Sequence, residues 1–210
     1  MSPDLLSPLR TRMRRLIRHQ RGVAGIEAAL ILPIMVFFIM ATVELYQYFR
    51  VVSILDRAAF TVADGIAMQA KTPDRIGGPC TAPNHICTYG AIMGKLMSPV
   101  DYAQGGQLIM RLYVADGSGG GAPVWSNEAS HGGWSTTCNG AGTCTDAAAS
   151  ASSPDSMPPP QPNDTVVVVQ ARQHYEPFII SSKFWTALGG SVDLSTTVFY
   201  RPRFDDLKEP

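Results

Sequence analysis

The sequence predicts an α+β protein, in which a single N-terminal transmembrane helix continues as a long amphipathic helix and packs on a small antiparallel β-sheet. Three observations support this prediction. Residues 23–43 form an apolar run with one charged member. Apolar residues then recur at helical spacing through residues 45–66. Segments rich in β-branched residues follow at 107–114, 165–172 and 192–200.

The apolar run is long enough to cross a membrane. It holds 21 residues, from Val23 to Val43, and Glu27 is its only charged member. At about 1.5 Å per residue, such a helix is about 32 Å long, against a hydrocarbon core of about 30 Å. A cleaved secretory signal is the alternative, but its apolar core is shorter, about 7–15 residues. Residues 44–47 also offer no small-residue cleavage site, so the sequence favours a retained span.

The charges around this run predict its orientation. Six arginines precede it, at Arg10, Arg12, Arg14, Arg15, Arg18 and Arg21, and Asp4 is the only acid among residues 1–22. The positive-inside rule therefore makes residues 1–22 a cytoplasmic basic leader and residues 23–46 the transmembrane helix, with the rest across the membrane. A basic segment directly before a span favours this interpretation over nucleic-acid binding, and no nucleic-acid-binding motif accompanies it.

The residues around the start of the run resemble a known processing site. Gly22 is followed by four small or apolar residues and then by Glu27. This pattern resembles type IV prepilins, in which a membrane prepilin peptidase cuts after the glycine. Two short motifs follow along the chain: LILP, which ends at Pro33, and VEL, which contains Glu44. Their order makes the segment more similar to the TadE-like minor pseudopilins of bacterial tight-adherence (Tad) pili. The resemblance covers residues 14–70 and implies a pilin-like fold.

The resemblance implies roles for three residues. A cut between Gly22 and Val23 creates an α-amino group on Val23, four residues before Glu27 on the same helix face. The implied role of Glu27 is subunit assembly, by pairing with the amine of a neighbouring subunit inside the lipid, where an unpaired charge is unfavourable. In the alternative, Glu27 lies about 6 Å into the span and reaches back to the cytoplasmic headgroups. Ala28 departs from the family pattern, because Tad pilins often carry an aromatic residue there.

Pro33 predicts a kink inside the span. Proline lacks an N–H and removes one hydrogen bond of the helix, which bends or loosens it locally. Pilin-like helices commonly carry such a proline, and a local break favours the departure of a subunit from the bilayer during assembly. Transmembrane helices also tolerate proline without any such role.

The helix is expected to continue beyond the membrane. Its apolar positions alternate spacings of three and four residues, at Leu45, Tyr48, Val52, Leu55, Ala59, Val62 and Ile66. Arg50, Arg57 and Asp64 lie opposite, seven apart. The segment 71–73 ends the helix, because it contains a proline. The apolar seam is expected to pack on the sheet of the same chain, to contact other subunits, or both.

The rest of the chain is expected to be a small periplasmic domain with an irregular insertion. Residues 47–115 supply the amphipathic helix and the first part of the domain, and residues 165–210 supply its β-rich end, in a sheet of three or four strands. A short helix is expected between Tyr89 and Met97, and a loop or short helix over 174–190. Residues 116–164 are dominated by Gly, Ala, Ser, Thr and Pro, which predicts a flexible, disordered insertion. Within this insertion, Trp125 and Trp134 are the residues that can pin parts of it to the domain.

The four cysteines fall into two local pairs, Cys80 with Cys87 and Cys138 with Cys144. All four lie beyond the span, in the compartment where disulfides persist, and local pairing is the simplest of the three possible connectivities. Metal binding is the alternative, with His85 and His131 nearby. The spacings C-x6-C and C-x5-C match no common zinc pattern, so two disulfides and no metal site are predicted.

Nothing in the sequence predicts catalysis or a cofactor. The glycines of 117–121 lack the lysine of a P-loop, and there is no nucleophile elbow and no His, Asp and Glu cluster at ligand spacing. The predicted function is therefore a non-enzymatic minor pseudopilin of a Tad (Flp) pilus. Its expected partners are the inner membrane, a prepilin peptidase, other pilin or pseudopilin subunits and the Tad assembly machinery. The alternative is a permanently anchored periplasmic binding or sensing protein.

Overall fold

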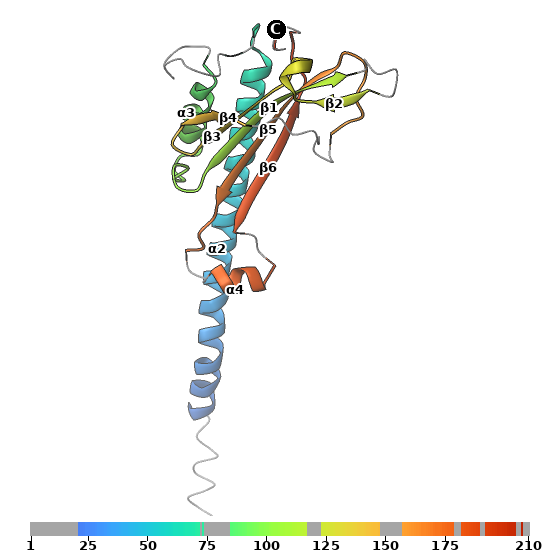
Figure 1. Ribbon diagram of the computed structural model, residues 1–210. Helices are drawn as coiled ribbons and strands as arrows, with labels where there is room; N and C mark the ends of the chain where they lie inside the picture. The colour runs from blue at the N-terminus through green and yellow to red at the C-terminus, as the bar shows by residue number, and fades with distance from the viewer. Residues whose placement is uncertain are drawn as a thin grey trace, which may run out of the picture. The chain divides into compact units, whose positions relative to one another are not determined.

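The computed structural model describes residues 21–71, 73, 85–116, 123–147, 157–178, 182–189, 192–204 and 207. It divides into two units, residues 1–46 and residues 47–210. One helix, α2, contributes to both units, and the sheet belongs to the second (Figure 1). A long N-terminal apolar helix with a small antiparallel sheet confirms the predicted α+β class.

Helix α2 extends from Arg21 to Ala67, over 47 residues. Its C-terminal end lies one residue beyond Ile66, the last position of the apolar pattern in the sequence. Its last carbonyl, at Ala67, accepts a hydrogen bond from the backbone N–H of Arg203 at 3.1 Å. A helix end leaves carbonyl groups without intrahelical partners, so this contact satisfies one of them from the C-terminal part of the chain.

The outer part of α2 buries one face in the core of the second unit. The buried residues of this face are Val51, Leu55, Ala58, Ala59, Val62, Ala63, Ile66 and Ala67. The predicted seam agrees from Tyr48 to Ile66, where Tyr48 and Val52 are partly buried against the same core. Leu45 is 46% exposed, and Val51 is more deeply buried than Val52. The predicted positions repeat every 3.5 residues on average, whereas an α-helix has 3.6 residues per turn. A row of side chains with the shorter repeat therefore shifts around the helix by about 20° in seven residues. When the row is extended toward the N-terminus, it moves off the buried face.

Among the described residues, six antiparallel strands form the sheet, in the order β4-β3-β1-β5-β6, and β2 pairs with β1 beyond the end of β3. The strands are β1 Gln107–Asp116, β2 Val124–Ser126, β3 Trp134–Asn139, β4 Cys144–Asp146, β5 Thr165–His174 and β6 Asp193–Tyr200. Three of them, β1, β5 and β6, occupy the segments that the sequence predicts as strands. The central strand β1 pairs Leu112 with Trp134 on one side and with Val167 on the other.

Strand β5 is covered on both faces, and this explains its composition. Val167 and Val169 belong to the core against α2, while Val166 and Val168 belong to a second cluster with Tyr113, Ala115 and Trp125. Successive side chains of a strand point to opposite faces, so a strand buried on both reads as a continuous apolar run. Burial on both faces therefore accounts for the four consecutive valines of β5.

The described part of the second unit also contains two short α-helices. Helix α3, Cys87–Leu96, agrees with the helix expected between Tyr89 and Met97, and α4, Ser182–Ala187, lies within the segment expected to be a loop or short helix. Tyr89 of α3 accepts a hydrogen bond from Gln69 Nε2 at 2.7 Å and donates one to the carbonyl oxygen of Gly65 at 3.1 Å. These two bonds attach α3 to the C-terminal end of α2.

Within the described residues 123–147 and 157–164, the structure differs from the expectation of a disordered insertion over residues 116–164. Three strands and the 3-10 helix η2, Ala129–His131, lie within this segment, and both β2 and β3 pair with β1. Composition misled the prediction because Trp125 and Trp134, with 4% and 1% exposure, provide apolar burial that the surrounding small residues lack. Pairing with β1 also satisfies the backbone groups of both strands. Residues 117–122 and 148–156 lie outside the described residues.

Candidate functional site

The predicted processing and assembly residues lie together at the start of α2. Gly22 and Val23 are helical residues of its first turn. Glu27 follows one turn later on the same continuous helix and is exposed. The rise of an α-helix separates Val23 and Glu27 by about 6 Å along the axis, on one face. The helix therefore holds the predicted cleavage position and the carboxylate in a defined register.

The surface around Glu27 is apolar and exposed. Its exposed large side chains are Ile26, Leu30, Ile31, Leu32, Ile34, Met35, Val36, Phe37, Phe38, Ile39, Met40 and Val43. Among the described residues, one helix is long and apolar enough to cross a membrane, within Gly25–Ala67. Its most apolar window has a mean hydropathy of 2.4, and none of that window is buried. A helix in the core of a soluble domain would have its apolar side chains covered, so a lipid environment suits this surface.

The polar groups within the apolar run are few. The hydroxyl of Thr42 donates a hydrogen bond to the carbonyl oxygen of Phe38 at 2.8 Å, which satisfies it within the helix. The α-helix continues through Pro33. Because proline has no N–H, the carbonyl of Ala29 loses its usual intrahelical donor there. A functional kink at Pro33 remains a prediction.

The cysteines lie in the second unit, apart from the apolar run. A disulfide joins Cys138 at the end of β3 to Cys144 at the start of β4, across the turn between the two strands. Helix α3 packs on this bond, since a Cβ on Gly90 would lie 3.4 Å from both sulfur atoms. Cys87 is also disulfide-bonded, and its Sγ lies 2.8 Å from Nδ1 of the buried His85. Cys80, its predicted partner, lies outside the described residues.

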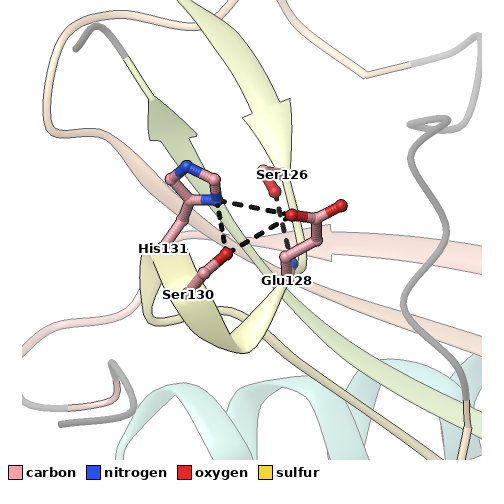
Figure 2. A network of polar contacts seen from close by, with 4 residues as sticks. All are labelled: Ser126, Glu128, Ser130 and His131. Carbon is pink, nitrogen blue, oxygen red and sulfur yellow. Dashed lines mark hydrogen bonds and ion pairs between the residues drawn. The ribbon is translucent and has the colours of Figure 1, made fainter.

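One surface network has the residue types of a hydrolase site, although its geometry differs. Figure 2 shows Ser130, His131 and Glu128 around η2, with Ser126 beside them. The Ser130 hydroxyl lies 3.1 Å from His131 Nδ1, and Glu128 Oε2 lies 3.7 Å from the same nitrogen. In a catalytic triad, the base contacts the nucleophile through one ring nitrogen and the acid through the other. The network therefore stabilises the local turn, where Glu128 N–H also donates to Ser126 Oγ at 3.3 Å.

A polar groove of about 430 Å³ lies where β5 ends and the chain enters β1. Its lining residues are Asp101, Gln104, Gly105, Gln173, His174 and Glu176. The buried Gln173 donates from Nε2 to the carbonyl oxygen of Gln104 at 3.2 Å, and His174 Nδ1 lies 2.8 Å from Asp193 Oδ1. Within the described part of the chain, no group of three His, Cys, Asp or Glu side chains is placed to hold a metal ion.

Burial raises the pKa of three tyrosine hydroxyls, those of Tyr89, Tyr102 and Tyr113. The pKa of Tyr102 is raised by desolvation, and its hydroxyl makes no hydrogen bond with any described residue. Desolvation also raises the pKa of Tyr89, whose bond from Gln69 acts in the opposite direction. Tyr89 and Tyr102 lie in the second unit, where they contribute to packing and to the attachment of α3.

Sequence reasoning missed a cluster of three aromatic rings. Tyr48 of α2 packs on Tyr175, with ring centroids 5.5 Å apart, and on Trp185 of α4, with centroids 5.3 Å apart. Tyr48 carried one available signal, because aromatic residues are enriched just outside membrane spans. Nothing local to Trp185, 137 positions further along the chain, could have indicated that its ring lies against Tyr48.

Comparison with known proteins supports the resemblance in the N-terminal part. The model of the family described as TadE-like protein matches residues 22–64. Searches of curated proteins and of solved structures produced no match. The matched segment includes Gly22, Glu27, Pro33 and the outer seam of α2 as far as Val62, and it ends before the sheet begins. Over residues 22–64 the chain is therefore similar to the TadE-like family, which agrees with the resemblance of its sequence pattern.

Proposed function

We propose that this protein is a minor pseudopilin that takes part in the assembly of a Tad-type pilus. One observation carries the proposal: the segment that matches the TadE-like family contains Gly22 and Glu27 in register on an exposed apolar helix. The family match associates the chain with Tad pili. The pseudopilin role adds that the helix is processed and that it contacts other subunits.

In this proposal the protein is a single-pass protein of the bacterial inner membrane. The arginines before Gly22 keep the N-terminus in the cytoplasm, and residues 47–210 lie in the periplasm. The exposed apolar surface between Ile26 and Val43 first faces lipid and later faces the helices of other subunits. The same surface suits both environments, because helices associate in lipid by packing and by pairing of polar groups.

Processing and assembly are coupled through one charge pair. A prepilin peptidase cuts between Gly22 and Val23, which removes the basic leader and creates an ammonium group at Val23. Glu27 of one subunit then pairs with this ammonium of a neighbour at the same depth in the bilayer. Each subunit carries one carboxylate and one ammonium, so a staggered array neutralises both charges where isolated ions are strongly disfavoured.

The N-terminus of the protein in cells with its prepilin peptidase tests this proposal. Intact-mass measurement is expected to show a chain that begins at Val23. Gly22→Ala is expected to leave the chain uncut. Gly25→Ala is the matched control, because a Cβ there meets no atom within 4 Å and the residue lies in the same helix. This variant should be processed normally.

The opposite result would favour a permanently anchored periplasmic protein. If a known pilin is cut in the same cells while this chain still begins upstream of Val23, the pseudopilin role is wrong. The span would then act only as an anchor.

A further inference from the structure

Two segments of the second unit line the polar groove at the end of β5. One segment is the end of β5 with the residues just beyond it, and the other is the loop that precedes β1. The lining residues are Gln173, His174 and Glu176 of the first segment, and Asp101, Gln104 and Gly105 of the loop. The volume of about 430 Å³ is within the range of about 300–1,000 Å³ that is usual for small-ligand sites.

The loop is held closely against β5. Gly105 has a φ of +78°, and a Cβ at this position would lie 3.0 Å from the Cβ of His174. Glycine therefore permits both the backbone conformation and the close approach. Asp101 fixes the loop from within, because Oδ1 accepts from the backbone N–H of Ala103 and Oδ2 accepts from Nε2 of Gln104, each at 3.2 Å. The groove is thus a formed feature of the fold.

The side-chain amide of Gln173 bridges the two segments and has an unused acceptor. Its Nε2 donates to the carbonyl oxygen of Gln104 at 3.2 Å and to that of His174 at 3.0 Å. Gln173 is 4% exposed, and its Oε1 accepts no hydrogen bond from any described residue. Burial of an acceptor without a donor is unfavourable, and most buried polar atoms have a partner. A ligand N–H at this oxygen removes that cost.

The groove carries negative charge. Asp101 and Glu176 are exposed carboxylates, and none of the described residues that line the groove is a lysine or an arginine. Glu176 makes no hydrogen bond or ion pair with another described residue. The ring of His174 contacts a carboxylate of its own, since Nδ1 lies 2.8 Å from Oδ1 of Asp193. The groups that remain available to a ligand are therefore mainly acceptors.

A cation with several N–H groups matches these acceptors. An alkylammonium group has three donors and a guanidinium group has five, and neither has an acceptor. Hydrogen bonds between such donors and carboxylates are stronger than those between neutral groups. A metal ion suits the groove less well, because no group of three His, Cys, Asp or Glu side chains in the described part of the chain is placed to hold one.

We propose that this groove binds an organic cation through its alkylammonium or guanidinium group. Asp101 and Glu176 pair with the charge, and Oε1 of Gln173 accepts a further N–H. Free polyamines carry such groups, and so do the lysine and arginine side chains of other proteins. The site consists of residues of the second unit alone, so it does not depend on processing at Gly22 or on the pseudopilin role.

Isothermal titration calorimetry of the full chain, in a non-ionic detergent at low ionic strength, tests the site. Acetyl-arginine methylamide represents the side chain of a protein, and spermidine represents a free polyamine. Acetyl-citrulline methylamide is the matched neutral probe, because a urea group replaces the guanidinium group. At least one of the two cations is expected to bind saturably, and the neutral probe is not. The cation that binds more tightly assigns the source of the group.

Variants that remove one charge locate the bound cation. Glu176→Gln and Asp101→Asn are each expected to weaken binding about two- to fivefold, as for exposed ion pairs. The double variant should weaken it further. Asp56→Asn is the matched control, since Asp56 is exposed on α2 and lies outside the groove. It should leave the affinity unchanged. Far-ultraviolet circular dichroism checks that each variant is folded, and Glu176→Gln removes no contact with a described residue.

Three results would overturn the proposal. The first is the absence of saturable binding of both cations to the folded wild-type chain. The second is equal weakening by Glu176→Gln and Asp56→Asn, which indicates general attraction to an acidic chain. The third is equal affinity for the arginine and citrulline probes, which excludes recognition of the charge. A chain that is cut before Val23 and binds neither cation keeps the pseudopilin role and loses only the proposed site.

Discussion

The indole Nε1 of Trp125 donates a hydrogen bond to the carbonyl oxygen of Pro158 at 2.8 Å, across 33 positions of the chain. The ring itself is 4% exposed and packs with Tyr113 and Val168. The bond joins β2 to the other end of the segment whose composition predicts disorder. A single aromatic side chain thereby supplies both apolar burial and a long-range polar contact there.

Trp125→Phe is therefore expected to lower the free energy of unfolding by about 0.5–1.5 kcal/mol, because the hydrogen bond from the indole to the carbonyl oxygen of Pro158 is lost. Urea unfolding of the full chain in detergent, followed by near-ultraviolet circular dichroism, measures this change. Limited proteolysis should also cut the variant faster within residues 123–164. Val124→Thr is the control, since Val124 is 63% exposed in the same strand, and it should change stability by less than about 0.5 kcal/mol. Equal effects of the two variants would contradict the role of Trp125.

The disulfide between Cys138 and Cys144 closes a loop with a sequence separation of 6. A loop of this size restrains the unfolded chain by about 2 kcal/mol in the chain-entropy description. Cys138→Ser should therefore lower the free energy of unfolding by about that amount, measured by urea unfolding of protein exported to an oxidising compartment. The double variant Cys138→Ser, Cys144→Ser should lose no more than the single variant, because the bond is lost once. Four free thiols in the exported wild-type protein, found by alkylation and mass measurement, would exclude both predicted disulfides.

Glu27 is expected to act only after the chain is cut. In processed protein, Glu27→Gln should weaken association with other subunits in lipid, measured by energy transfer between labelled copies. In the Gly22→Ala background the same change should have no further effect, because the amine of Val23 is absent. The effect of Glu27→Gln on the free energy of association should therefore differ between the two backgrounds. This difference measures the coupling between Glu27 and the amine of Val23, and it is expected to be about 0.5–3 kcal/mol for groups in contact.

Ala28→Gln tests whether an added polar group in the span has the same effect as the lost charge. Ala28 is exposed beside Glu27, and this variant should associate like the wild type. An equal loss from Glu27→Gln in both backgrounds would instead support a contact between Glu27 and lipid headgroups.

The buried Tyr102 predicts one part of the response of the second unit to alkaline pH. Burial raises the pKa of Tyr102 above its usual value of about 10, so the folded state keeps a proton that the unfolded state loses. Stability is therefore unaffected by this group below about pH 10 and falls as the pH rises further. Tyr102→Phe should weaken this alkaline loss. At neutral pH it should raise the free energy of unfolding by about 1 kcal/mol, because it removes a buried hydroxyl without a hydrogen bond among the described residues.

Tyr89→Phe is the matched comparison. The Tyr89 hydroxyl bonds with Gln69 and with the carbonyl of Gly65, so its loss should lower stability at neutral pH by about 1 kcal/mol. Urea unfolding at pH 7 and over pH 9–11 measures both variants. Destabilisation by Tyr102→Phe at neutral pH would show that its hydroxyl has a partner in the folded protein.

Much of the N-terminal half could be predicted, because its structure follows from patterns among residues that are close together in the sequence. The apolar run, the outer seam from Leu55 to Ile66 and the spacing between Gly22 and Glu27 are all readable at helical periodicity. The strands β1, β5 and β6 were readable for the same reason, from short runs of β-branched residues. The segment around Trp125 was not, because small and polar residues lack a periodic apolar pattern, and its strands form only by pairing with β1.

The sequence by itself determined a long apolar helix with one carboxylate in register with a glycine, and a β-rich remainder. Only the tertiary structure decided the strand order, the burial of β5 on both faces, and the attachment of α4 to Tyr48 through Trp185. The physical reason is the distance over which each interaction acts along the chain. Helical periodicity arises between residues three and four positions apart, whereas ring packing and strand pairing join residues separated by tens of positions or more.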